Sequence, residues 1–446
     1  TVDSASTSAD SLGIDVDADS TVTALSVGHI TPVSIANGKT LSGGITVTAG
    51  SLKLAETGTL ASSVSMSGGT LDADNSLTVS GTVTQAGNAT IDIFADKTLT
   101  FSTAEISTGI NELTLAGAGT IAFPSNASGI VVNNAAGLLK LAGTGTLGAA
   151  KVTAVSNAGK GLAVNASSTI SNLKVAANTE LNVAADKTLS GALEVAGNKT
   201  LTLSGTGTLG STLNLEGTLK AGASLTVLGT INVVDNATVS IPAAGTTLTY
   251  SGGGLNVGAH TLSIGGAGTF SNATGSPLVL DVADSILDLS GSGTISGPVK
   301  LENGTVKSTG TPTISGTLTQ YDNAIIDVAT NQTLTYSGPS LSLGANKLTL
   351  TGGGTFNNTN ALVLNNADSL LSLAGILTIG DVDGTSASNS GKGIQVTSSA
   401  TLGDYDLSAV SYLTLAANKT LAGQLNLKTN GELKTSGDGQ YIGDIE

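Results

Sequence analysis

Cysteine and tryptophan are absent from this chain, and aromatic residues make up only 2% of its 446 residues. Without cysteine, no disulfide and no thiolate metal site can form. With so few large aromatic side chains, the chain lacks the material for a thick globular core. It can still build a thin core of stacked Leu, Ile, Val and Ala side chains, which is what a narrow β-coil needs.

Charged residues are also scarce, at 11% of the chain, against about a quarter in an average domain. All 17 basic residues are lysine, and with 32 acidic residues the formal net charge is −15. This balance excludes a general affinity for nucleic acid, because such binding needs basic side chains that displace counterions from phosphates. It also argues against anionic membrane surfaces. No apolar run reaches the length of a transmembrane helix, so we expect no membrane insertion by this segment.

Glycine, by contrast, is abundant, with 60 residues, and a two-residue phrase recurs in which a hydroxyl residue precedes an apolar one. Successive copies start about 21 residues apart, and self-similarity at such a period is typical of solenoids. The 22 copies are Thr1-Val2, Thr21-Val22, Thr40-Leu41, Thr59-Leu60, Ser76-Leu77, Thr98-Leu99, Thr120-Ile121, Thr146-Leu147, Thr169-Ile170, Thr188-Leu189, Thr208-Leu209, Ser224-Leu225, Thr247-Leu248, Thr269-Phe270, Thr294-Ile295, Thr313-Ile314, Thr333-Leu334, Thr355-Phe356, Thr378-Ile379, Thr401-Leu402, Thr420-Leu421 and the degenerate Gln440-Tyr441.

Each period reads as three short strands separated by turn residues. In residues 40–58, the segments 40–43, 44–47 and 51–54 carry apolar residues at alternate positions. Alternation directs Leu41 inward and Thr40 outward. The steps vary from 16 to 26 residues, whereas a left-handed hexapeptide helix would keep to multiples of six. We therefore predict an all-β fold, a right-handed parallel β-helix (β-solenoid) of about 21 coils of roughly 21 residues.

A longer sequence repeat spans several coils. Residues 87–91 match residues 235–239, 148 positions later, and match residues 322–326 again. We find no linker, charge run or change of composition that would mark a domain boundary. The sequence thus predicts a single continuous β-solenoid over residues 1–446, with internal long-repeat blocks at 1–145, 146–293, 294–377 and 378–446.

With its coils rich in Gly, Thr, Ser, Asn and Ala, no cysteine and an acidic surface without arginine, the chain resembles a known class. It is similar to the β-helical shafts of large bacterial surface proteins, such as autotransporter passengers and filamentous-haemagglutinin-type adhesins. The resemblance implies an extracellular or cell-surface location. It also implies a structural, non-catalytic shaft of a fibre, sheath, layer or adhesin.

Three carboxylates stand at alternate positions near the start of the chain, at Asp15, Asp17 and Asp19, on one side of an expected strand. They resemble the start of a calcium loop, but the glycine at its sixth position and the glutamate at its twelfth are missing. Calcium is therefore a weak candidate cofactor here. A solvated acidic edge is the interpretation that the sequence favours, and we expect no other cofactor.

Catalytic groups are not evident in the sequence. His29 and His260 lie far apart, with no second metal ligand near either. Polysaccharide-degrading enzymes also use right-handed β-helices, and they remain a remote alternative. Their chemistry needs paired carboxylates, or a carboxylate with a basic partner. Here there is no arginine, and the acidic residues are scattered between repeats, so we predict that the chain is not an enzyme.

A specific binding face for glycans or ice is the leading alternative to a passive shaft. A flat ice-binding face would show regular Thr-x-Thr rows, but the residue after the phrase is Thr in only six of the 22 coils. Glycan binding would need exposed aromatic residues. We expect Phe94, Phe101, Phe270 and Phe356 to occupy apolar strand positions instead.

Asn-x-Ser/Thr triplets, which can accept N-linked glycans in a suitable host, occur throughout. Turn-forming or buried Asn is the alternative interpretation. The triplets begin at Asn88, Asn126, Asn165, Asn198, Asn236, Asn272, Asn303, Asn331, Asn357 and Asn418.

The sequence also leads to an expectation about partners. Thr1-Val2 falls in phase with the repeat, and residues 440–446 begin a further coil. Each end of a solenoid leaves apolar core and strand edges open. We therefore expect either continuation of the same solenoid or end-to-end self-association. Glycans are a further candidate partner.

Overall fold

The computed structural model describes residues 2–3, 13–375 and 377–446. Every regular element in this part of the chain is a β-strand, and it contains no helix. It therefore contains no helix with the length and apolarity needed to cross a membrane. The chain divides into two compact units, unit 1 (residues 1–219) and unit 2 (residues 220–446).

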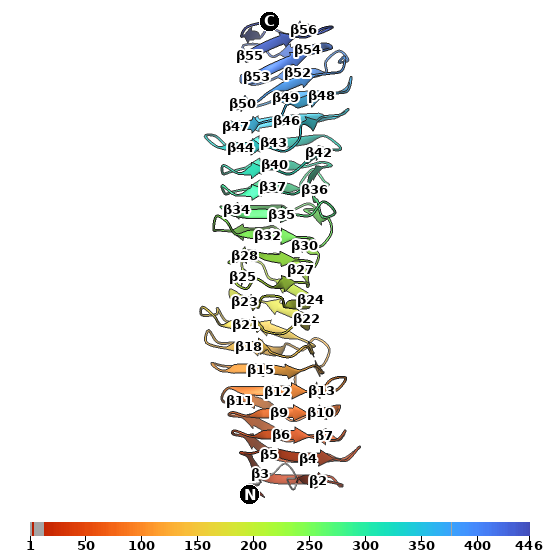
Figure 1. Ribbon diagram of the computed structural model, residues 1–446, viewed down its shortest axis with the longest axis vertical. Coiled ribbons are helices and arrows are strands. Elements are labelled where there is room, and N and C mark those ends of the chain that lie inside the picture. The colour runs from red at the N-terminus through yellow and green to blue at the C-terminus, as the bar shows by residue number, and fades with distance from the viewer. Residues whose placement is uncertain (1, 4–12, 376) are drawn as a thin grey trace. The chain divides into compact units, whose positions relative to one another are not determined.

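In both units the strands fall on three faces, which the chain visits in turn. The first face holds the phrase strands, the second face follows it, and the third face completes the coil. Within each unit, strands of one face lie above one another (Figure 1).

In unit 1 the first-face strands are β3 (Ser20–Val27), β5 (Thr40–Val47), β7 (Thr59–Leu60), β10 (Leu77–Val79), β13 (Thr98–Phe101), β16 (Thr120–Ala122), β19 (Thr146–Leu147), β22 (Ser168–Val175), β24 (Thr188–Val195) and β26 (Thr208–Leu209). Of these, β3, β5, β22 and β24 continue onto the second face. The other second-face strands are β1 (Val2–Asp3), β8 (Ser63–Met66), β11 (Val83–Gln85), β14 (Glu105–Ser107), β17 (Gly129–Val132), β20 (Ala150–Val152) and β27 (Thr212–Leu215). The third face holds β2 (Ile14–Val16), β4 (Thr31–Ile35), β6 (Ser51–Leu54), β9 (Thr70–Ala73), β12 (Ala89–Ile93), β15 (Glu112–Gly117), β18 (Leu138–Leu141), β21 (Gly161–Val164), β23 (Thr179–Val183), β25 (Thr200–Leu203) and β28 (Thr218–Ala221), where the chain passes into unit 2.

In unit 2 the first face holds β29 (Leu225–Val227), β32 (Thr247–Tyr250), β35 (Thr269–Asn272), β38 (Thr294–Ile295), β41 (Thr313–Ile314), β44 (Thr333–Tyr336), β47 (Thr355–Asn358), β50 (Leu377–Ile379), β53 (Ala400–Leu407), β55 (Thr420–Leu427) and β57 (Gln440–Ile442). Strands β53 and β55 continue onto the second face. Its other strands are β30 (Ile231–Val233), β33 (Leu255–Asn256), β36 (Leu278–Leu280), β39 (Val299–Leu301), β42 (Leu318–Gln320), β45 (Leu341–Ser342), β48 (Leu362–Leu364) and β51 (Val382–Gly384). The third face holds β31 (Ala237–Ile241), β34 (Thr261–Gly266), β37 (Ile286–Leu289), β40 (Thr305–Ser308), β43 (Ala324–Val328), β46 (Lys347–Gly352), β49 (Leu370–Leu373), β52 (Gly393–Val396), β54 (Val410–Leu415) and β56 (Glu432–Ser436).

Equivalent strands of successive coils pair in parallel. On the third face of unit 1, for example, β9 pairs with β12, β12 with β15 and β15 with β18, all in parallel. The predicted parallel β-solenoid is confirmed, with about 20 turns about 21 residues apart. That residues 1–446 form one continuous solenoid stays a prediction, because it concerns both units together.

Alternating burial explains why these sequences form strands around a thin core. In β13 and β44 the side chains alternate between half-buried Thr and buried apolar residues. The inward Leu99, Leu189 and Leu334 are all buried, as the alternation predicts. Burial of stacked aliphatic side chains between three faces is the main stabilising term for such a coil.

A glycine merges two of the predicted strands. The sequence predicts separate strands over 40–43 and 44–47, but β5 is one strand over both. Gly43 has φ of 115°, and a Cβ on it would overlap the carbonyl oxygen of Val22 in the previous coil. Glycine therefore lets the chain bend from the first to the second face without leaving the hydrogen-bonded ladder.

Register corrects two sequence assignments near the start of the chain. Val2 pairs with Leu25 on the second face, so Thr1-Val2 is not a copy of the first-face phrase. Ser20, not Val22, lies opposite Leu41, which places Thr21-Val22 two residues out of phase. A slide of two residues preserves the inward and outward alternation, so the sequence pattern does not reveal it.

Phe94 was expected at an apolar strand position, and this expectation is wrong. Its side chain is 62% exposed. Strand β12 ends at Ile93, and Phe94 begins a turn in which the Lys97 N–H donates to the Phe94 carbonyl oxygen. The remaining aromatic residues of that expectation, Phe101, Phe270 and Phe356, are buried.

Candidate functional site

The predicted acidic edge lies at the start of the described chain. Asp15 is in β2, Asp17 and Asp19 follow it, and all three side chains are exposed. Among the residues that the structure describes, no three His, Asp or Glu side chains gather so that they could hold a metal ion. Asp19 instead accepts a hydrogen bond from the Thr40 N–H at 2.9 Å.

The bond made by Asp19 recurs with other residues. The N–H that opens the next first-face strand is bound by the hydroxyl of Ser76 at 3.0 Å, of Ser167 at 3.1 Å, of Ser224 at 3.0 Å and of Ser399 at 3.1 Å. In every case one oxygen of a short side chain accepts the hydrogen bond from this backbone N–H. Asp19 thus ties one coil to the next, and the three carboxylates act as an acidic edge.

The second acidic group lies in unit 2. Asp383 is opposite Asp406 in the parallel ladder, and Lys428 lies 3.4 Å from Asp406. Burial raises the pKa of Asp383, and repulsion from Asp406 and then from Asp381 raises it further. Asp381 itself accepts a hydrogen bond from the Asp404 N–H at 3.0 Å. The carboxylates of Asp381, Asp383 and Asp406 therefore repel one another on the outside of consecutive coils.

His29 and His260 lie between strands. Their backbone oxygens accept hydrogen bonds from the next coil, from Ser51 N–H at 3.2 Å and from Ile286 N–H at 3.0 Å respectively. Neither joins a group of metal-ligating side chains in the described part of the chain. Both therefore serve as loop residues whose backbone supports the coil.

Several of the Asn-x-Ser/Thr triplets have a conformational role. Asn198, Asn331 and Asn418 have φ of 58°, 62° and 60°, a left-handed conformation that Asn tolerates better than most residues. Each is the third residue of a β-turn that precedes a strand. Asn272 is buried, and its amide donates to backbone oxygens of Ser276 and, in the next coil, Pro298.

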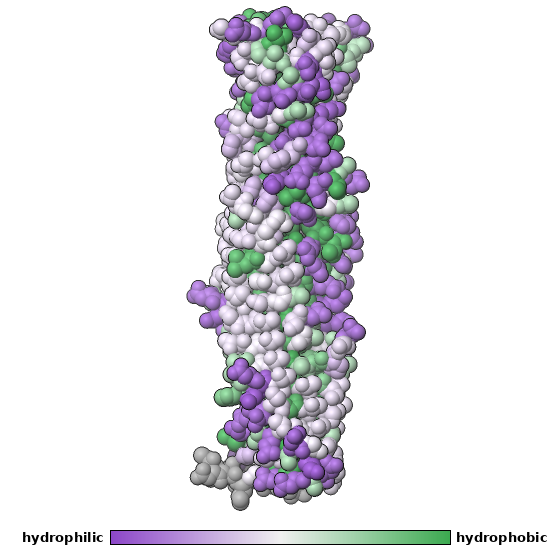
Figure 2. Space-filling model, turned by 90° about the vertical axis from the view of Figure 1, so that its right-hand side faces the viewer, coloured by the Kyte–Doolittle hydropathy of each residue, from purple (hydrophilic) through white to green (hydrophobic). Residues whose placement is uncertain are grey.

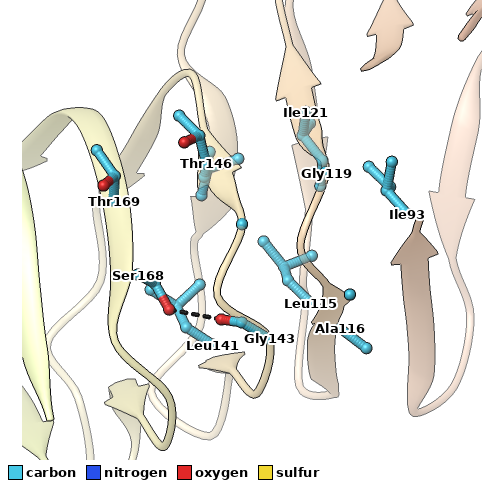
Figure 3. Close-up of a pocket in the computed structure, with 13 residues that line it drawn as sticks. Ile93, Leu115, Ala116, Gly119, Ile121, Leu141, Gly143, Thr146, Ser168 and Thr169 are labelled. Atoms are coloured by element: carbon cyan, nitrogen blue, oxygen red, sulfur yellow. Dashed lines mark hydrogen bonds between the residues drawn. The ribbon is translucent and has the colours of Figure 1, made fainter. Parts of the chain in front are cut away.

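Where the third face turns into the first, unit 1 contains a cavity of about 20 Å³, which is room for about one water. In the close-up, Leu115, Leu141 and Ile121 surround it, and the Ser168 hydroxyl donates to the Gly143 carbonyl oxygen at 2.7 Å (Figure 3).

Glycines at this corner explain the cavity. A Cβ on Gly143 would overlap the carbonyl oxygen of Gly117 in the previous coil, and a Cβ on Gly291 would overlap that of Gly266 in unit 2. A smaller cavity of about 10 Å³ recurs beside the second pair. Both cavities are lined by these glycines, which have no side chain to fill the corner. Neither cavity is large enough for a ligand.

The first face displays ladders of Thr. Thr98, Thr120, Thr146 and Thr169 pair in direct register in unit 1. In unit 2, Thr247, Thr269, Thr294 and Thr313 do the same. Figure 2 shows broad areas of near-neutral surface on the face that it presents. Neighbouring Thr side chains on a pleated surface stabilise it by packing and hydrogen bonding.

The second-face ladder has three breaks at equivalent places in the described chain. Strands β11 and β14, β30 and β33, and β42 and β45 are successive but not hydrogen-bonded to each other, whereas β8–β11, β14–β17 and β45–β48 are paired. A break leaves backbone groups of two strands without their ladder partners. Side chains or other molecules must satisfy them.

Tyr336 fills the break between β42 and β45. Its ring is buried and stacks on Phe356 with centroids 6.5 Å apart. Its hydroxyl accepts a hydrogen bond from the Leu318 N–H at 3.2 Å and donates to the Pro339 carbonyl oxygen at 2.5 Å. One phenol thus replaces a missing ladder contact between two coils. The sequence did not indicate this role, although the repeated Thr-Leu-Thr-Tyr marks the place.

Tyr250 takes the same position at the break between β30 and β33. Its hydroxyl accepts a hydrogen bond from the Ile231 N–H at 3.5 Å, and burial raises its pKa. In unit 1 the equivalent residue is Phe101, which lies opposite Val79 as Tyr250 lies opposite Val227. Phenylalanine has no hydroxyl, so the break between β11 and β14 is the one of the three that no tyrosine fills.

The structure shows a parallel β-solenoid, and the resemblance to bacterial surface shafts stays an expectation. No family model, no curated protein and no solved structure matches the chain.

Proposed function

We propose that the chain is a structural, non-catalytic element of an extracellular or cell-surface assembly, such as a fibre, sheath, layer or adhesin. The observation that carries this proposal is the unbroken third-face ladder of each unit. In unit 1 it runs from β2 through β25, and in unit 2 from β31 through β56. A continuous parallel ladder over a sealed core distributes load over many backbone hydrogen bonds.

Side chains on the outside add contacts between coils. Lys53 lies 2.9 Å from Asp74, and Lys174 lies 2.5 Å from Glu194. Both pairs are partly exposed, and pairs of this kind contribute about 0–1 kcal/mol each. Their use is therefore to keep neighbouring coils in register and the surface hydrated, and most of the stability comes from the core.

A mechanical measurement tests this function. When the full chain is pulled between its ends by force spectroscopy, we expect it to unravel coil by coil. Each step should lengthen the chain by about 70 Å, since a coil of about 21 residues extends by about 3.3–3.6 Å per residue. Release of long stretches at low force, without steps of this size, would contradict a load-bearing role.

Ice binding is a second candidate, because the Thr ladders present hydroxyl and methyl groups at the regular spacing of parallel strands, about 4.8 Å. The register between β41 and β44 opposes ice binding, because it shifts the Thr row by two residues. Thr313 lies opposite Thr335 and not Thr333. An assay of ice recrystallisation separates the candidates. Inhibition that is lost in Thr120→Lys, but kept in a control such as Thr226→Lys outside these ladders, would favour ice binding over a purely structural role.

A further inference from the structure

The unfilled break in unit 1 opens into a groove. The volume is about 540 Å³, within the range of about 300–1,000 Å³ that is common for small-molecule sites. Strand β11 and the residues around it form one wall, and β14 with its flanking loops forms the other. The lining residues are Thr82, Val83, Thr84, Gln85, Thr103, Ala104, Glu105, Ser107 and Gly109.

The groove holds polar atoms that have no partner within the described chain. The Gln85 amide donates to the Glu112 carbonyl oxygen at 2.8 Å, but its Oε1 is buried without a hydrogen bond. The Thr103 hydroxyl is likewise buried and without a partner. The equivalent Gln320 Oε1, at the filled break in unit 2, is buried without a partner as well. The Thr103 hydroxyl is therefore the unpaired atom that is particular to this break, and a buried unpaired polar atom needs an explanation.

Thr103 also distinguishes this break from the two that are filled. In unit 2 the equivalent residues are Gly252 and Gly338. A Cβ on either would overlap a carbonyl oxygen of the previous coil, that of Gly229 or Gly316, and would also crowd the ring of Tyr250 or Tyr336. Tyrosine therefore goes with glycine, and Phe101 goes with threonine. In unit 1, Phe101 leaves the position of the tyrosine hydroxyl empty, and Thr103 adds its own hydroxyl beside that position.

The position left empty has a defined chemistry. In unit 2 the Tyr336 hydroxyl accepts from Leu318 N–H and donates to Pro339 C=O. By the repeat, the equivalent groups in unit 1 are Val83 N–H and Ala104 C=O, but the Ala104 oxygen already accepts a hydrogen bond from the Gly129 N–H at 3.1 Å. A group that fills the gap must therefore accept from the Val83 N–H, and an alcohol hydroxyl can do so while donating its own hydrogen to a nearby oxygen.

We propose that this groove, between β11 and β14, binds a neutral sugar unit. One sugar hydroxyl takes the place of the Tyr336 hydroxyl, and neighbouring hydroxyls donate to Gln85 Oε1 and bind Thr103 Oγ1. The apolar side of the ring packs along the groove toward Ile110, which is 68% exposed. Glu105 is the only charged residue of the lining, which disfavours an anionic ligand. This binding role is additional to the structural function.

The test uses the full chain with ¹⁵N-labelled valine, in which the Val83 amide is assigned from a Val83→Ile variant. The probes are four methyl glycosides, those of β-glucose, β-galactose, α-mannose and N-acetyl-β-glucosamine, each titrated separately. We expect at least one to shift the Val83 amide resonance with saturation. If none of the four does so, the proposal is wrong.

A matched variant fills the break as unit 2 does. Phe101→Tyr with Thr103→Gly recreates the pair of residues found at Tyr336 and Gly338, so the fold should tolerate it, and unchanged resonances of the other valines verify this. We expect the affinity for the active glycoside to fall at least tenfold. Unchanged affinity in this variant would overturn the proposal.

A second variant covers the case in which the double substitution perturbs the fold. Ile110→Ser changes an exposed side chain next to the groove without touching the core, and we expect it to weaken binding several-fold. A control, Ile30→Ser, alters an exposed Ile of a different coil and should leave the affinity unchanged. Equal effects of the two variants would also count against the groove. None of these results bears on the force measurement, so the two proposals fail independently.

Discussion

The hydroxyl groups of Tyr405 and Ser411 lie 2.6 Å apart in the core of unit 2. Tyr405 is in β53 and Ser411 is in β54, and both side chains are 1% exposed. Burial strongly raises the pKa of Tyr405, so the phenol stays protonated and neutral throughout the usual pH range. The hydrogen bond joins the second face to the third face within a single coil.

Tyr405→Phe should therefore destabilise the protein. It leaves the Ser411 hydroxyl buried without a partner, which costs about 1–3 kcal/mol. Chemical denaturation monitored by circular dichroism measures the change. In a double variant, Tyr405→Phe with Ser411→Ala, both polar groups are gone and most of the stability should return. A double variant no more stable than the single one would show that the hydrogen bond is not the cause.

Leu334→Asp should destabilise by several kcal/mol, because an unpaired charge replaces a fully buried aliphatic side chain. The matched control is Thr333→Asp at the adjacent, half-buried position on the outside of the same strand. We expect the control to cost far less. Thermal unfolding of both variants provides the comparison, and similar losses would contradict the assigned inward and outward faces.

Gly143→Ala should destabilise unit 1, because the added Cβ overlaps the Gly117 carbonyl oxygen at the corner between the third and first faces. Overpacking of a tight site costs about 1–3 kcal/mol. Gly275→Ala is the control, since a Cβ on Gly275 has no atom within 4 Å. Hydrogen exchange of the amides in β19 and β22 reports the local effect, and equal protection in both variants would rule out the close approach.

Asp383→Asn should stabilise the protein near pH 7. The fold raises the pKa of Asp383, chiefly by burial, so it favours the protonated form. The stability linked to this group is fully present below the unfolded pKa, about 3.9, and is lost as the pH rises through the folded value. Asparagine stays neutral at all pH values, so the variant should gain at pH 7 and match the parent at pH 3. Urea unfolding at both pH values checks this, and a loss of stability at pH 7 would contradict the direction of the shift.

Calcium removal should leave the N-terminal coils unchanged. Asp19 already accepts a backbone hydrogen bond from Thr40, and Asp15 and Asp17 remain exposed. We expect the same melting temperature with calcium and with a chelator. A chelator-dependent drop that disappears in Asp17→Asn would support calcium binding at this edge.

Much of the fold was predictable because its pattern is local and repeated. Leu99, Leu189 and Leu334 hold the same place in the phrase as Leu41, which alternation directs inward, and all three are buried. Phe94 shows the limit of this method. It is apolar and follows an apolar strand, but the turn that begins there places it outside.

The candidate site was less predictable. The spacing of the acidic residues 15, 17 and 19 resembles the start of a calcium loop, yet Asp19 makes the same backbone contact as Ser76 or Ser167. The groove between β11 and β14 has no sequence signature, because its lining consists of residue types that occur throughout the chain. Only a comparison of Phe101 with Tyr250 and Tyr336 in three dimensions reveals the contact that unit 1 lacks.

The sequence by itself determined the class of fold, because a period of about 21 residues with alternating apolar positions can bury its side chains only when successive coils stack. The tertiary structure alone decided the register between coils. Sliding a parallel strand by two residues, as at Ser20 and Leu41, keeps every side chain on its own face, so the hydrophobic pattern is equally satisfied before and after the slide. What distinguishes the alternatives is the fit of individual groups across coils, such as the Tyr336 hydroxyl against the Leu318 N–H, and such contacts exist only once the coils are assembled.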